Sequence, residues 1–266
     1  ASFGGLLVSN YLYDKENLSL VVTIISMLLA IYFSSRVERQ EQVFKGDSST
    51  FKQVFEQFTQ IKENPLIRNF IFYAFIWTCL STALWFFQLE IINNFTNDSA
   101  VKTQIFGRAD SIVPIITLAT QLLLTSYFLR SKYLGIRFVL TMYGVLFTVA
   151  FLAVSGYFSE YLLSASGITL FLILQGTMRP FEYGLNKPAR EAVFTTLSTK
   201  EKYKSTVFID TFTNRFGDAT GGLLFNSLLS FGLLLYAAPL AIIPLAIFLI
   251  NLGWSISKDI DPVNSK

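Results

Sequence analysis

The chain has 266 residues, of which 52% are hydrophobic and only 15% are charged, and its net charge is +3. A soluble domain carries about 25% charged residues, so this composition favours a protein embedded in lipid. There is no histidine and a single cysteine, Cys79, which excludes histidine-based catalysis, an internal disulfide bond and the usual zinc and haem sites. We therefore expect no metal and no cofactor. We also expect no nucleic-acid partner, because nearly all of the positive residues lie in the loops between the spans.

Long uncharged runs recur along the chain, with lengths close to the roughly 20 apolar residues that a membrane-spanning helix needs. Lipid offers the backbone no hydrogen-bond partner, so each run is expected to be a helix. The chain begins with Ala1, and residues 1–11 look like the second half of a span. Seven full spans are then expected, at residues 18–35, 69–89, 111–129, 138–155 and 161–178 and as two helices within 205–257 that separate near residue 231.

These runs predict an all-α, polytopic transmembrane helix bundle with one partial and seven full spans, which is a portion of a longer protein. Most of the 21 lysine and arginine residues lie in alternate loops between the spans. The positive-inside rule places those loops, and with them the C-terminus, in the cytoplasm. We predict a multi-pass protein of the bacterial inner membrane, in contact with the lipid bilayer.

The longest inner connection, residues 36–67, has a pattern of its own. Apolar side chains recur at helical spacing within residues 49–62, and Asn64-Pro65 then interrupts the segment. We interpret it as a short amphipathic helix at the inner membrane face; the alternative is a disordered linker.

Two spans, a long inner connector and six further spans are the layout of a twelve-helix transporter of the major facilitator type. The predicted divisions are the end of an N-terminal six-helix half at 1–35, a cytoplasmic linker at 36–67, a C-terminal six-helix half at 68–258 and a cytoplasmic tail at 259–266. The missing N-terminal half of the same protein is then an expected partner.

The penultimate span contains the densest polar pattern. Asp210, Asn214 and Asp218 recur every four residues and so share one helical face, and Arg215 is placed to pair with Asp218. Glycines at 217, 221 and 222 would let this helix pack closely on a neighbour. Two interpretations stay open: a cavity-facing or gating polar face, and a structural salt-bridge network that holds two helices together.

A second polar segment precedes it. Pro180, Gly184 and Pro188 are expected to interrupt any helix there. The charged residues of this segment can either hold an anionic group or act as inner anchors paired with one another; they are Arg179, Glu182, Lys187, Arg190 and Glu191.

Polar residues also mark the span at 111–129. Arg108 and Asp110 are expected to open it from the outer side. Its threonines and Gln121 either line a path or bond helix to helix. In the span before it, Trp77 and Trp85 either anchor at the membrane interface or stack on a substrate.

Four stretches resemble the ATP:ADP antiporter family of nucleotide transporters: Asn186-Lys187-Pro188-Ala189-Arg190-Glu191-Ala192-Val193-Phe194, Glu201-Lys202-Tyr203-Lys204, Ile209-Asp210-Thr211 and Arg215-Phe216-Gly217-Asp218. Leu134-Gly135-Ile136-Arg137 is similar to the short basic turn of the wider major facilitator superfamily. The resemblance implies the twelve-helix fold, with matching positions at Arg190, Glu191, Asp210, Arg215 and Asp218. The sequence departs from that family at Trp85, which no charged residue flanks, so nucleotide specificity is a separate question from fold.

These observations lead to a hypothesis of function. We expect a secondary active transporter, and not an enzyme, that moves a small anionic, nucleotide-like solute by alternating access. The substrate-binding or gating residues are expected among those named above: Arg108, Asp110, Arg179, Glu182, Arg190, Glu191, Asp210, Asn214, Arg215 and Asp218. One alternative is a membrane scaffold or sensor that retains the transporter fold without transport. A second is a membrane-embedded lipid-modifying enzyme.

Overall fold

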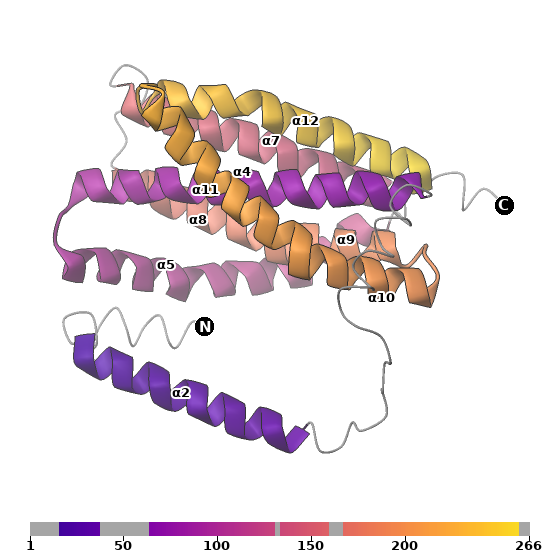
Figure 1. Ribbon diagram of the computed structural model, residues 1–266, viewed down its shortest axis with the longest axis horizontal. Helices are drawn as coiled ribbons and strands as arrows, with labels where there is room; N and C mark the ends of the chain where they lie inside the picture. The colour runs from indigo at the N-terminus through magenta and orange to yellow at the C-terminus, as the bar shows by residue number, and fades with distance from the viewer. Residues whose placement is uncertain (1–15, 38–63, 131–133, 160–166, 261–266) are drawn as a thin grey trace.

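The computed structural model describes residues 16–37, 64–130, 134–159 and 167–260. Every regular element within these ranges is a helix, which confirms the all-α prediction for the described part of the chain. Most helices run alongside one another around α4 (Pro65–Phe95), and α2 (Glu16–Val37) lies to one side (Figure 1). The expected partial span at 1–11, the inner helix at 49–62 and nearly all of the tail lie outside the described residues.

Four of the described helices are long and apolar enough to cross a membrane. The first is α4, and the second is the helix Ser99–Phe128, formed by α5 (Ser99–Thr120), η3 (Gln121–Thr125) and most of α6 (Ser126–Arg130). The third and fourth are Gly135–Phe158 in α7 (Leu134–Phe158) and Ala237–Lys258 in α12 (Ala237–Ile260). They coincide with four of the expected spans.

Two further continuous helices are more polar. One consists of α8 (Gly167–Phe181), η4 (Glu182–Asn186) and α9 (Lys187–Phe194); the other of α10 (Thr199–Phe208), η5 (Ile209–Thr213) and α11 (Asn214–Ser230). Most of the candidate site residues lie on these two helices. The expected span at 161–178 falls on α8, of which the described part begins at Gly167.

The centre of the bundle is α4. It begins at Pro65, because the Asn64 side chain caps the Leu66 N–H at 3.0 Å and a proline in the first helical turn lacks only a donor that has no helical partner. Its side chains, such as the fully buried Phe70 and Phe87, pack against α7, α8, α11 and α12. The helix α4 therefore packs against each of these four neighbours.

Glycines set the closest helix contacts. A Cβ atom on Gly221 would lie 2.4 Å from the backbone oxygen of Cys79, and one on Gly217 would lie 2.9 Å from that of Phe75. The predicted close packing of the penultimate helix is thus confirmed, and α4 is its neighbour. On the far side of the bundle, a Cβ atom on Gly253 of α12 would lie 2.9 Å from the Leu140 backbone of α7.

The prediction that proline and glycine interrupt the helix around residues 180–188 is wrong. The helix continues from Gly167 to Phe194 and widens into a π-helical turn at η4, where the Lys187 N–H bonds to the Glu182 carbonyl. Pro188 has no N–H to offer the Gly184 carbonyl, and the Thr125 hydroxyl donates to that carbonyl instead. A neighbouring helix therefore supplies what the proline lacks.

The helix that carries Arg108 and Asp110 also begins earlier than expected. Asp98 caps it by accepting a 2.9 Å hydrogen bond from the Ala100 N–H, and the helix starts at Ser99. Arg108 and Asp110 therefore lie inside a membrane-length apolar helix and not at its entrance.

Candidate functional site

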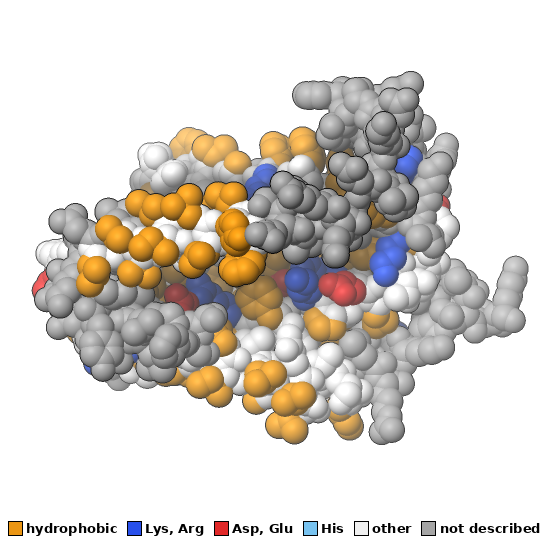
Figure 2. Space-filling view, turned by 90° about the horizontal axis from the view of Figure 1, so that it is seen from below, with side chains coloured by type: hydrophobic (Ala, Val, Ile, Leu, Met, Phe, Trp, Pro, Cys, Tyr) orange, Lys and Arg blue, Asp and Glu red, His pale blue; other side chains and the backbone are white. Residues whose placement is uncertain are grey.

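Charged side chains gather along one face of the bundle. Figure 2 shows acidic and basic side chains close together in a hollowed strip on this face, bordered by hydrophobic side chains. Ionisable groups among apolar helices are costly, so they usually face a cavity or pair with one another. The structure describes both arrangements here.

The first charged pair joins α5 to α8. Arg179 forms an ion pair with Asp110 at 2.5 Å, and both side chains remain open, with 40% and 53% of their surfaces exposed. The Arg179 guanidinium also lies 5.7 Å from the centre of the Trp85 ring on α4, within the range of a cation–π contact. Three helices thus contribute to one exposed polar group.

A buried amide pair lies one turn from Arg179. The Gln175 amide donates a 2.6 Å hydrogen bond to the Gln88 oxygen, so the same two helices, α8 and α4, are joined a second time. Both side chains are buried, and the Gln175 oxygen has no hydrogen-bond partner among the described residues. Burying polar side chains costs free energy. We therefore expect this pair either to hold α4 and α8 in one arrangement or to contribute to the charged strip.

The second charged pair lies within one helix and is buried. Arg190 contacts Glu182 at 3.1 Å, and the two side chains are only 14% and 11% exposed. The Arg190 guanidinium lies 4.4 Å from the centre of the Trp77 ring on α4. Glu182 also accepts a 2.7 Å hydrogen bond from the Asn186 amide, and the Tyr73 hydroxyl lies 3.2 Å from the Asn186 oxygen.

Burial dominates the electrostatics of this group. The buried Glu182 carboxylate is balanced by the Arg190 guanidinium and by the hydrogen bond from the Asn186 amide. Glu182 lies on η4, outside the four apolar helices. Lys187 and Glu191, its neighbours along the helix, are exposed.

The polar face of the penultimate helix lies against α4. The Thr78 hydroxyl lies 3.1 Å from the Asn214 oxygen, and the Thr82 hydroxyl donates a 2.8 Å hydrogen bond to Asp218. One turn earlier, the Asn214 amide donates to Asp210 at 3.3 Å. The structure therefore gives this face a helix-joining role at Asn214 and Asp218, and it leaves Asp210 exposed.

The expected local pair between Arg215 and Asp218 is present, at 3.9 Å. Arg215 is 80% exposed, so the pair does not compensate a buried charge. Arg108 is exposed, and within the described ranges no ion pair joins it to another residue.

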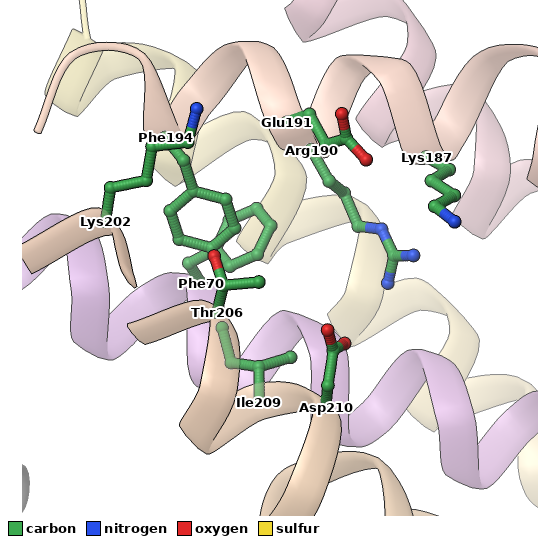
Figure 3. Close-up of a pocket in the computed structure, with 9 residues that line it drawn as sticks. All are labelled: Phe70, Lys187, Arg190, Glu191, Phe194, Lys202, Thr206, Ile209 and Asp210. Atoms are coloured by element: carbon green, nitrogen blue, oxygen red, sulfur yellow. The ribbon is translucent and has the colours of Figure 1, made fainter. Parts of the chain in front are cut away.

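A hollow of about 150 Å³ lies between α4, α9, α10 and η5. Charged residues of both signs and three apolar residues line it: Lys187, Arg190, Glu191, Lys202, Asp210, Phe70, Phe194, Ile209, with Thr206 between them. Figure 3 shows the Arg190 guanidinium pointing across the hollow toward the Asp210 carboxylate. The hollow thus brings together three of the residues that the sequence singled out, Arg190, Glu191 and Asp210.

Sequence reasoning missed the residues that hold these charges in place. Tyr73 and Asn186 link α4 to η4, and the buried Gln88 and Gln175 link α4 to α8. A usable signal existed, since amide side chains inside apolar runs are expensive without a partner. Trp77 does not behave as a simple interface anchor, because Arg190 lies over its ring.

No protein-family model, no curated protein and no solved structure matches this chain.

Proposed function

We propose that the chain forms part of a secondary active transporter of the major facilitator type, which moves a small solute by alternating access. In this proposal residues 68–258 are the C-terminal six-helix half, and the two polar helices cross the membrane together with the four apolar ones. The resemblance of the stretches around Arg190, Asp210 and Arg215 to the ATP:ADP antiporter family is consistent with it.

One observation carries the proposal: the Asp110–Arg179 ion pair is exposed on the surface of the helix bundle. Asp110 lies in a membrane-length helix, where a charge is maintained against a cost of a few kcal/mol or more. A pair kept only for stability would be expected to be buried or placed at a water-facing end. An open pair between two long helices can instead contact a polar solute and can break or re-form when the helices move.

The second pair supports the same function from a different position. Arg190 contacts Glu182 and Trp77, and within the described ranges its guanidinium donates one hydrogen bond, to Glu182, although a guanidinium has five N–H donors. It faces the hollow that Asp210 also lines. Two separate cationic positions, Arg179 and Arg190, are consistent with a polar solute that contacts the protein at more than one point.

The test is uptake of radiolabelled solute by the full-length parent protein in proteoliposomes, preloaded in turn with nucleotides, amino acids and organic anions. We expect exchange for one of these classes, and its loss in Asp110→Asn and Arg179→Gln at unchanged protein level. Lys102→Gln on the same helix is the matched control and should leave exchange intact, because Lys102 lies outside the pair and bonds to Asn93.

Exchange that depends on internal ATP or ADP would extend the proposal to nucleotides. Absence of flux for every class, measured with verified folded protein, would contradict it and favour a membrane scaffold. Equal activity in Asp110→Asn, Arg179→Gln and the parent would show that the ion pair has no role in transport, and the proposal would lose its main support.

A further inference from the structure

The hollow beside Arg190 is small. Its volume of about 150 Å³ equals that of a cavity which accepts one benzene-sized molecule. Sites for larger ligands start near 300 Å³. The hollow is therefore suited to a molecule with about six to nine non-hydrogen atoms, and it is too small to enclose a nucleotide.

Its charged residues come from three segments. Arg190, Lys187 and Glu191 enter from α9, Lys202 from α10, and Asp210 lies opposite Arg190 on η5 (Figure 3). Among the described residues, no ion pair within 4 Å joins Arg190 to Asp210, although the two groups face one another. A space is thus left between the Arg190 guanidinium and the Asp210 carboxylate.

The third side of the hollow is apolar. Phe70 of α4 and Phe194 of α9 are buried and pack edge to face, with ring centres 4.6 Å apart. Ile209, also buried, continues this surface toward Asp210. An apolar group bound against these residues would be removed from water and would not displace Arg190 or Asp210.

We propose that this hollow binds a small zwitterion with an apolar body, of the size of an aliphatic amino acid. The carboxylate would lie between Arg190 and Lys187, the ammonium at Asp210, and the hydrocarbon side chain against Phe70, Phe194 and Ile209. A simple anion offers no partner to the Asp210 carboxylate, and a simple cation offers none to the Arg190 and Lys187 cations, so a ligand with both charges fits best.

This proposal narrows the proposed function to one class of solute, and it rests on that function only in treating the bound molecule as a transported one. Binding itself can be measured without any flux. The probe is radiolabelled leucine, added to the purified full chain in detergent and counted by scintillation proximity. Three competitors divide the recognition into parts: leucinamide lacks the carboxylate, 4-methylpentanoate lacks the ammonium, and ADP represents a nucleotide.

We expect saturable leucine binding, with each of the two half-ligands competing at least tenfold more weakly than leucine. Asp210→Asn should weaken leucine binding at least tenfold, and Lys187→Gln should weaken it severalfold. Arg190 is left unchanged, because it also holds Glu182. Arg68→Gln is the matched control, since Arg68 is exposed on α4 outside the lining of the hollow and should bind leucine as the parent does.

The proposal is overturned if folded protein shows no saturable leucine binding, if either half-ligand competes as well as leucine, or if Asp210→Asn binds like Arg68→Gln. Displacement by ADP at equal potency would also overturn it. Flux of another solute without leucine binding would leave the transporter proposal standing and remove this one. Leucine binding without any flux would leave the binding proposal standing and contradict the transporter proposal.

Discussion

The side-chain amide of Gln121 donates a 3.1 Å hydrogen bond to the backbone carbonyl of Tyr183. Both residues lie in π-helical turns, Gln121 in η3 and Tyr183 in η4, and these turns contact one another. Thr125 donates to the neighbouring Gly184 carbonyl. Two long helices are thus joined where each departs from α-helical geometry, a feature often found at functional positions in helices.

Gly184 has no room for a side chain in this joint. A Cβ atom there would lie 2.7 Å from the Thr120 side chain, whereas one on Gly176 of the same helix would have its nearest contact at an ordinary 3.7 Å. We predict that Gly184→Ala lowers the free energy of unfolding in mixed detergent micelles by about 1–3 kcal/mol. Gly176→Ala, the matched control, should be neutral or up to about 1 kcal/mol more stable, since alanine favours helix. Equal effects of the two substitutions would contradict a close η3–η4 contact.

The Thr125 hydroxyl is predicted to matter more than other threonine hydroxyls on the same helix. Thr125→Val leaves the Gly184 carbonyl without the donor that replaces Pro188, at a cost of about 1–3 kcal/mol. Thr117→Val is the control, because the Thr117 hydroxyl only adds a second bond to the Val113 carbonyl of its own helix. The measurement is the thermal midpoint followed by tryptophan fluorescence; a Thr117→Val protein as unstable as Thr125→Val would refute the assigned role.

The Glu182–Arg190 pair is predicted to determine stability. Both side chains are nearly buried, so Glu182→Gln leaves an unbalanced guanidinium and should cost about 3–5 kcal/mol. The double variant Glu182→Gln/Arg190→Gln should be more stable than the sum of the two single changes allows, because the pair is lost together. Glu191→Gln, an exposed change on the next helical segment, should be within about 0.5 kcal/mol of the parent. Additive single changes would show that the two residues do not interact.

The sequence predicted the apolar helices because their signal is local. Uncharged runs around Phe70–Phe87, in α7 and in α12 each carry the length and hydrophobicity of a span within their own residues. The close approach of Gly217 and Gly221 to a neighbour was also predictable, although the identity of that neighbour was not. Helix partners depend on the packing of the whole bundle, which local patterns do not contain.

The course of the chain around Pro188 was mispredicted for the same reason. Proline is a helix breaker when no other donor is available, and here Thr125 and Gln121 supply donors to carbonyls 59 and 62 residues away. Likewise, the pairing of Asp110 with Arg179 spans 69 residues. The sequence could nominate both charges as site residues, but only the folded bundle assigns them to one another.

The Asp110–Arg179 pair is predicted to affect flux and not stability, in contrast to the buried pair. Both side chains are about half exposed, so the ion pair contributes only about 0–1 kcal/mol to folding. Asp110→Arg places two guanidinium groups together, and Arg179→Asp places two carboxylates together; each single change should abolish exchange in proteoliposomes while shifting the thermal midpoint little.

The swapped double variant restores opposite charges across α5 and α8 and should recover part of the exchange, because attraction between the helices returns with reversed polarity. Recovery distinguishes a pair that opens and closes from two residues that act separately on the solute. If the swap stays inactive while the protein remains folded, the charges contact the solute individually and the gating role of the pair is wrong.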